Sequence, residues 1–138
     1  MDCIFCKIVS GDIPASKVYE DKDLIAFLDI APASKGHVLV IPKKHSESIA
    51  DTSERVLSSL SIAVRKVSKA LLKDNEGVNV LQNNGKAAGQ LVNHLHFHVI
   101  PRNSGDGLEI AHWHAKKYAD GEIIQFQDRI KKHLKETR

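Results

Sequence analysis

The sequence predicts an α+β fold: an antiparallel sheet of about five strands, one long helix packed on it, a short N-terminal helix and a C-terminal helix. Several short apolar stretches are bounded by turn residues, which is typical of strands. One stretch, 52–73, instead repeats its apolar residues every three or four positions, which is typical of an amphipathic helix. Most links between these stretches are as short as hairpin turns, so we expect antiparallel neighbours.

The first half of the chain supplies the short helix and three strands of this prediction. Residues 3–9 are apolar and are followed by turn residues, which indicates one or two helical turns. The stretches 17–20 and 24–28 flank a short polar turn and predict a β-hairpin. Residues 36–42 form a nearly continuous β-branched run that ends at a proline, which predicts a strand covered on both faces.

The second half supplies the long helix, two more strands and the terminal helix. The stripe of the helix at 52–73 consists of Val56, Leu60, Ala63, Val67, Ala70 and Leu71. Residues 78–82 predict a strand, and the turn at 83–90 follows it. The spacing of the apolar residues between positions 123 and 134 predicts a terminal helix. We therefore expect one domain over 1–138, with its core at about 3–102 and a C-terminal extension at 103–138.

The most informative stretch is 94–101, where histidines alternate with apolar residues. Successive residues of a strand point to opposite faces, so His94, His96 and His98 are expected to share one face while the intervening side chains share the other. A helix would scatter the three imidazoles around its axis. The pattern predicts a strand with one chemical and one buried face. An imidazole can be a nucleophile, a proton shuttle or a metal ligand at neutral pH.

The turn before the histidines favours an anionic ligand. Gly85 and Gly89 allow backbone N–H groups to approach a ligand closely, and such an amide-lined concavity beside imidazoles suits a phosphate group. The turn is not a P-loop, because Gly85-Lys86 lacks both the upstream glycine and the hydroxyl residue after the lysine.

The motif Cys3-x-x-Cys6 leaves three interpretations open. Two thiolates with two histidines complete a tetrahedral zinc site, for which His45 and one histidine of the alternating row are candidates. Alternatively, the cysteines are buried and reduced. A redox motif is the third interpretation, although no strand precedes the motif as a βαβ unit requires. A bound metal would have a structural role and would pin the N-terminal segment to the sheet.

Composition is that of a soluble protein with a mildly basic balance. The net charge is +3, and Lys131, Lys132, Lys135 and Arg138 supply much of the excess. Seven aromatic residues in all give no ladder for stacking bases, so a nucleic-acid binder is the less favoured alternative to a solvated helix face. No run has the length of a membrane span and no secretory signal is evident, so we expect a cytoplasmic protein with no membrane partner and no disulfide.

The stretch His94-Leu-His96-Phe-His98-Val-Ile resembles the histidine triad signature. The likeness extends over 3–9, 24–32, 36–45 and 83–102 in the same order, and the chain resembles the Hint branch of the histidine triad (HIT) superfamily in its prokaryotic zinc-bearing form. The resemblance implies a HIT-like fold. It also implies a nucleotide hydrolase or transferase that acts on the α-phosphate of nucleoside 5′-monophosphate derivatives, as an adenosine 5′-monophosphoramidase does. The expected substrates are purine nucleotides of the AMP or GMP type. Alternatives are a diadenosine polyphosphate hydrolase and a nucleotide-binding scaffold with little catalysis.

The resemblance also implies a role for each histidine. His96 would attack phosphorus and form a nucleotidyl-histidine intermediate, His98 would contact the phosphate and the leaving group, and His37 would orient the imidazoles. No metal is needed for this chemistry, because N–H donors can meet the developing charge. One structural zinc ion per chain would be bound by Cys3, Cys6, His45 and His94.

The resemblance further implies a nucleotide site and a homodimer. Asp29 would bind the ribose hydroxyls. The base pocket would be lined by Ile4, Phe5, Ile8, Phe27 and Ile30, although core packing explains Ile8 and Phe27 equally well, and the phosphate would be held by Asn83, Gly89, Gln90 and His98. Leu91 departs from the family, which often has a hydroxyl residue there, so the preference for P–N bonds is open. The C-terminal segment around His112, Trp113 and His114 would reach the partner's site, or would be a partly buried aromatic loop.

Overall fold

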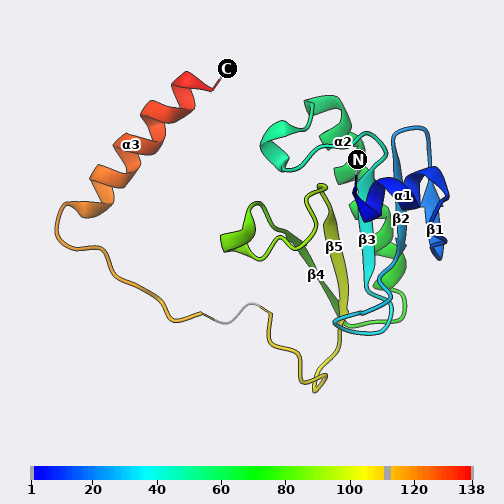
Figure 1. Cartoon of the computed structure of the whole chain (residues 1–138). Coiled ribbons are helices and arrows are strands. Elements are labelled where there is room, and N and C mark those ends of the chain that lie inside the picture. Colours follow the sequence, from blue (N-terminus) through cyan, green and yellow to red (C-terminus); the bar gives the residue numbers. More distant parts are fainter. Residues whose placement is uncertain (1, 111–112, 138) are drawn as a thin grey trace. The chain divides into compact units, whose positions relative to one another are not determined.

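The computed structural model describes residues 2–110 and 113–137. The helices and strands in chain order are α1 (Ile4–Ser10), β1 (Lys17–Glu20), β2 (Leu24–Leu28), β3 (Val38–Pro42), α2 (Glu54–Leu71), β4 (Gly77–Gln82), β5 (Phe97–Arg102) and α3 (Glu122–Glu136). Short 3-10 turns lie at Ile49–Asp51 and Lys86–Ala88. The five strands form one sheet in the order β1-β2-β3-β5-β4, and each neighbouring pair is antiparallel, as Figure 1 shows. The predicted fold class is confirmed.

Two hydrophobic clusters cover the two faces of the sheet. Alternate residues of β2 and β3 point to opposite faces, so each strand contributes to both clusters. The α2 face is formed by Leu24, Ala26, Val38, Val40, Leu60, Ala63, Val64, Val67, Leu95 and Val99. The α1 face is formed by Cys3, Phe5, Ile8, Ile25, Phe27, Leu39 and Ile41. The strand predicted to be covered on both sides, β3, is buried along its whole length.

Local capping explains where the two core helices begin and end. The Ser53 hydroxyl accepts a hydrogen bond from the Val56 N–H at 3.2 Å and caps α2. At the start of α1 the Cys3 sulfur accepts from the Cys6 N–H at 3.4 Å. Gly11 ends α1 in the left-handed conformation with φ of 85°, which a residue with a side chain rarely adopts. The N-cap of α1 is therefore also one of the predicted metal ligands.

The strand expected to start at His94 starts at Phe97. The first residue of β5, Phe97, pairs with Val40 on one side and with Gln82 on the other. Upstream of these pairs, neighbouring carbonyls have other partners: the Pro42 carbonyl accepts from the His94 ring at 2.8 Å. The side chains still alternate, because Leu95 lies in the α2-face cluster while the flanking histidines point away from it. The predicted alternation of the histidine and apolar side chains is confirmed, but the hydrogen-bonded strand begins three residues later than predicted.

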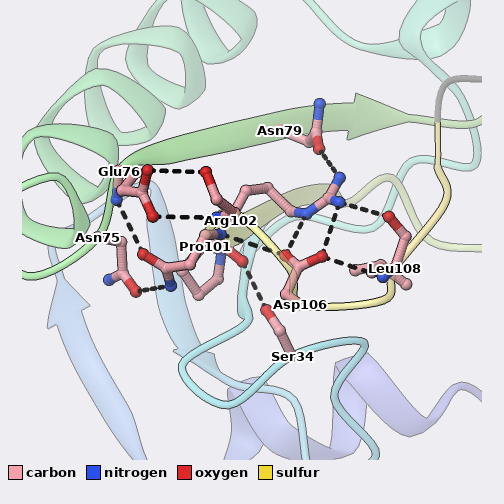
Figure 2. A network of polar contacts seen from close by, with 10 residues as sticks. Ser34, Asn75, Glu76, Asn79, Pro101, Arg102, Asp106 and Leu108 are labelled. Carbon is pink, nitrogen blue, oxygen red and sulfur yellow. Dashed lines mark hydrogen bonds and ion pairs between the residues drawn. The ribbon is translucent and has the colours of Figure 1, made fainter.

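A polar network fixes the loop after β5 (Figure 2). The Arg102 guanidinium donates to Asp106 at 2.8 and 3.1 Å and to Asn79 at 2.7 Å. Glu76 accepts two hydrogen bonds from Ser104, both at 3.0 Å. These contacts tie the loop to β4 and to the α2–β4 turn. The chain divides into two compact units after Leu108.

The second unit, from Glu109 onward, contains the predicted terminal helix. Within α3 no residue is buried, and its large apolar side chains are exposed: Ile123, Ile124, Phe126, Ile130 and Leu134. Trp113 is also exposed, at 80%. His112, which the sequence placed beside Trp113, lies outside the described residues. Among the described residues, no helix combines the length and the apolar character that crossing a membrane requires.

Leu95 anchors the histidine stretch, because its side chain is 0% exposed in the α2-face cluster. We expect Leu95→Ala to lower the free energy of unfolding by about 2–5 kcal/mol, the usual cost of emptying a leucine site in a core. The matched control is Leu91→Ala in the same loop, where the side chain is 93% exposed and the expected change is below about 0.5 kcal/mol. Urea unfolding measures both, and equal effects would contradict the assigned anchor.

Candidate active site and metal centre

Four predicted metal ligands converge beside the N-terminus of α1. The nearest ring nitrogen or sulfur atoms of Cys3, Cys6, His45 and His94 all lie within 4.8 Å of one another. The His94 Nδ1 is 3.5 Å from the Cys3 sulfur and 3.6 Å from the Cys6 sulfur. The His45 Nδ1 is 3.3 Å from the Cys6 sulfur and 3.2 Å from the His94 Nδ1. Two sulfurs and two nitrogens in this arrangement can hold one metal ion.

Three separate elements bring these ligands together. The two cysteines lie at the start of α1, His45 follows β3, and His94 precedes β5. The His94 Nε2–H donates to the Pro42 carbonyl at 2.8 Å, so the Nδ1 lone pair faces the cluster. Burial lowers the pKa of His94 and raises that of the Cys6 thiol. Both cysteines are free thiols that contact histidine nitrogens, and this arrangement favours metal binding over apolar packing or redox chemistry.

The second group of imidazoles is His37, His96 and His98. Antiparallel pairing of β3 with β5 places Leu39 opposite His98, and this register brings His37 beside it. The His37 Nε2 is 2.9 Å from the His98 Nδ1. The His96 and His98 ring centroids are 4.9 Å apart. The sequence placed all three histidines in one site, and the structure brings them together.

Hydrogen-bond partners decide which ring nitrogen carries the proton in each of these histidines. The Ala33 N–H donates to the His37 Nδ1 at 3.0 Å, so neutral His37 carries its proton on Nε2 and donates to His98. The His98 proton is then on Nε2. The His96 Nδ1 is 2.7 Å from the His94 carbonyl, which can only accept. Neutral His96 therefore has its lone pair on Nε2, as a nucleophile requires.

Burial keeps His37 and His98 neutral. Burial, followed by the neighbouring imidazoles of His96 and His37, lowers the pKa of His98 to about 4. Burial likewise lowers the pKa of His37, against the opposing effect of Asp29. At neutral pH these rings are therefore hydrogen-bonding groups rather than cations.

His96 and His98 line an apolar pocket of about 280 Å³ on the α1 face of the sheet. This volume lies near the lower end of the range for small-molecule sites, roughly 300–1,000 Å³. Other predicted residues that line the pocket are Ile4, Phe5, Ile8, Phe27, Asp29 and Ile30. The Phe5 ring meets the Phe27 and His96 rings edge to face, at centroid distances of 5.7 and 5.2 Å. The predicted base and ribose residues thus share one cavity with the imidazoles.

The lining residues differ in exposure and in partners. Ile8 and Phe27 are buried in the core cluster and also line the pocket. Ile30 and Leu91 are 98% and 93% exposed and form part of the rim. Asp29 accepts a hydrogen bond from the Ala31 N–H with one carboxylate oxygen, and the other lies 3.8 Å from the His37 Nδ1.

The loop predicted to bind phosphate contains two glycines with positive φ and one buried glutamine. Gly85 and Gly89 both have φ of 89°, and the Asn83 amide nitrogen would lie 3.7 Å from a Cβ at Gly89. The Gln90 side chain is buried and hydrogen-bonded at both ends: its amide nitrogen donates to the carbonyls of Glu47 and Val92 at 2.7 and 3.0 Å, and its oxygen accepts from the Gly85 N–H. The Gln90 amide therefore holds the loop closed.

Sequence reasoning missed several lining residues. Leu39 shares a strand face with His37, so the alternation along β3 could have placed it in the pocket. Ile13, Pro14 and Ala15 line the pocket from the link between α1 and β1, and no local pattern marks such positions. The contact of Pro42 with His94 is made by a backbone carbonyl, which leaves no signature in the sequence.

Comparison with known proteins places this geometry in a family. The protein-family model described as "HIT domain" matches residues 10–105, a range that contains His37, His96 and His98. The chain belongs to the HIT family. The resemblance seen in the histidine stretch is confirmed, and the zinc-type ligand cluster accompanies it in the structure.

Relatives of the HIT family match nearly the whole chain. The adenosine 5′-monophosphoramidase of Schizosaccharomyces pombe is 46% identical over 136 residues, which cover 98% of this chain and 100% of that protein. The crystal structure of a HIT family member from Bacillus subtilis has a TM-score of 0.89 and 40% identity over 96% of each chain. A zinc-bound histidine triad protein from Mycobacterium smegmatis has a TM-score of 0.76 and 40% identity, over 83% of this chain and 85% of that one.

The low pKa of His98 predicts acid destabilisation. An unfolded histidine binds a proton near its ordinary pKa of 6.5, whereas folded His98 does so only near 4. The unfolded chain therefore binds more protons as the pH falls from 6.5 to 4, and the free energy of unfolding falls by up to about 3 kcal/mol from this group.

Chemical unfolding at several pH values tests this assignment. The His98→Gln variant should show a shallower fall than the wild type over this interval, because glutamine does not titrate. His133→Gln, at an exposed position in α3, is the control and should keep the wild-type slope. Acid titration of the cysteine and histidine cluster is common to all three chains. Identical slopes for His98→Gln and the wild type would refute the assigned pKa.

Proposed function

We propose that this HIT protein is a nucleotide hydrolase or transferase that cleaves nucleoside 5′-monophosphate derivatives at the α-phosphate, with phosphoramidates of AMP as a substrate class. The observation that carries this proposal is the hydrogen bond from the His96 Nδ1–H to the His94 carbonyl, which leaves Nε2 unprotonated beside the pocket. The phosphoramidase activity named for the S. pombe relative supports the same reaction class.

In the proposed reaction the His96 Nε2 lone pair attacks phosphorus. The new P–N bond forms as the bond from phosphorus to the leaving group breaks, and the departing amine takes up a proton from solvent. Water then attacks the nucleotidyl-imidazole, which releases the nucleoside monophosphate and restores neutral His96. The His98 Nε2–H is the donor proposed to meet charge on the phosphoryl oxygens, and His37 fixes that donor through its 2.9 Å hydrogen bond.

The same pocket supports binding of the nucleoside. Its apolar lining suits a flat purine, with Phe5 and Phe27 already in edge-to-face contact. Asp29 lies at the pocket with one carboxylate oxygen directed toward His37, and we assign it to the ribose hydroxyls because a carboxylate can accept two hydrogen bonds. Asn83 and the backbone around Gly89 are assigned to the phosphate, while Gln90 supports their loop.

We further propose that the metal ion of the cysteine and histidine cluster is zinc in a structural role. A tetrahedral zinc ion holds sulfur and nitrogen ligands about 3.5 Å apart and two nitrogen ligands about 3.3 Å apart. The corresponding separations here are 3.3 to 3.6 Å and 3.2 Å. Zinc would link α1 to the segments that flank β3 and β5. The zinc-bound relative supports this choice of metal.

A homodimer is also proposed. β4 is an outer strand of the sheet, and Val80 on it is 46% exposed, so this edge is available for pairing with a second copy. Trp113 and His114, both exposed, belong to the segment that the family resemblance directs toward the partner's site.

Replacing the proposed nucleophile tests the reaction. We expect His96→Ala to lower kcat for a fluorogenic adenosine phosphoramidate by roughly 10³-fold or more, as loss of a nucleophile does. AMP binding, measured by calorimetry, should persist because the base pocket is intact. His133→Ala, on α3, is the control with wild-type turnover. Turnover by His96→Ala at the wild-type rate would refute the covalent scheme.

Metal analysis tests the zinc proposal. Protein purified without chelator should contain one zinc ion per chain, and Cys6→Ser should lose it and melt at a lower temperature, because a structural zinc contributes folding free energy. Ser10→Ala, in the same helix but outside the cluster, is the control and should keep its zinc. Near-zero zinc in the wild type, with unchanged melting in Cys6→Ser, would show that the cysteines are only packed.

A further inference from the structure

The proposed nucleophile lies where the sheet no longer holds the backbone. Pairing of β5 with both neighbours ends at Phe97, so His94, Leu95 and His96 lie outside the ladder. A backbone segment without ladder hydrogen bonds needs other partners to be fixed in one conformation. The position of the His96 ring therefore depends on contacts other than β pairing.

The first of these contacts runs through His94. Its ring is held at both nitrogens, by the Pro42 carbonyl at Nε2 and by the ligand cluster at Nδ1. The backbone carbonyl of the same residue accepts the His96 Nδ1–H at 2.7 Å. One fully buried residue thus joins the metal centre to the ring that is proposed to attack phosphorus.

The second contact holds the other side of the same peptide group. The Leu95 N–H donates to the Ser46 carbonyl at 2.7 Å, and Ser46 follows the ligand His45 directly. The peptide plane between His94 and Leu95 is therefore held by the segment that carries His45 and by the ligand His94 itself. Rotation of this plane would move the carbonyl that determines the His96 tautomer.

The third contact is made by the ring of Phe5, a residue of α1 that lies between the ligands Cys3 and Cys6 in the sequence. Phe5 meets the His94 and His96 rings edge to face, with centroid distances of 5.8 and 5.2 Å and interplanar angles of 79° and 81°. α1 has only seven residues, too few to be stable alone, so its position depends on its tertiary contacts: the packing of Phe5 and Ile8 on the sheet and the contacts of the two cysteines.

We propose that the cluster of Cys3, Cys6, His45 and His94 positions the His96 imidazole, so that metal occupancy sets both its orientation and its tautomer. The four ligands are positioning residues: they contact neither phosphorus nor the leaving group. The kinetic part of this inference rests on the proposed function, whereas the structural part, the state of the His96 ring, does not.

Cys6→Ser tests the inference, because Cys6 is the less buried of the two cysteines. We expect kcat for adenosine 5′-phosphoramidate to fall roughly 10- to 100-fold, as happens when the support of a reacting group is loosened. KM should change by less than about threefold, because Phe5 and Ile8 still pack α1 on the sheet and keep the nucleoside pocket lined. In ¹⁵N NMR spectra at one fixed pH, the His96 ring should change from a single Nδ1–H tautomer to a mixture.

Leu60→Ala is the matched control, because it destabilises the opposite face of the sheet without touching the cluster. At a temperature where it is folded, it should keep wild-type kcat and the Nδ1–H tautomer of His96. If Cys6→Ser does not fold, the same comparison is made on the wild-type chain stripped with a chelator and reloaded with zinc.

Two outcomes would overturn the inference. One is a metal-free chain whose His96 remains in the single Nδ1–H tautomer, whatever its activity. The other is an equal loss of kcat and of the tautomer in Leu60→Ala, which would mean that general stability is responsible. If the wild-type chain is inactive toward the phosphoramidate, the proposed function fails, but the His96 spectra still decide the positioning role.

Discussion

Alternation of side chains across the sheet at residues 94–99 is the constraint on which the site depends. Leu95 and Val99 are fully buried on the α2 face. Because side chains alternate along a strand, His96 and His98 must then point to the opposite face. His96 and His98 consequently face the pocket under α1, and His94 faces the ligand cluster beside it. The apolar residues of this stretch thus determine where the imidazoles lie.

The sheet order then assembles the rest of the site. Because β5 lies between β3 and β4, His37 before β3 meets His98, and the end of β3 brings Pro42 and His45 to His94. α1 covers the same face and closes the pocket with Phe5 and Ile8. Neutral, hydrogen-bonded imidazoles suit this partly buried position, because a charged ring there would lose hydration without a paired carboxylate at hydrogen-bond distance.

Much of this arrangement could be predicted from local patterns, because burial and period are local properties of the sequence. The hairpin, the long helix and the alternating histidines were all predicted, but the start of β5 was not. The alternation also does not indicate which histidine binds a metal together with the cysteines, because it places His94, His96 and His98 on the same face of the strand. That choice depends on where the ladder ends. The carbonyl partners of Gln90 and His94 come from segments 43 and 52 residues away, and backbone carbonyls carry no sequence signal.

In the proposed reaction one imidazole, His96, presents an unprotonated Nε2 to the nucleotide. Mass spectrometry of enzyme quenched during turnover of an adenosine phosphoramidate tests this claim most directly. We expect a peptide that contains His96 and carries one added adenylyl group, attached at that residue. An adduct on His94 or His98, or steady turnover with no adduct on any histidine, would contradict it.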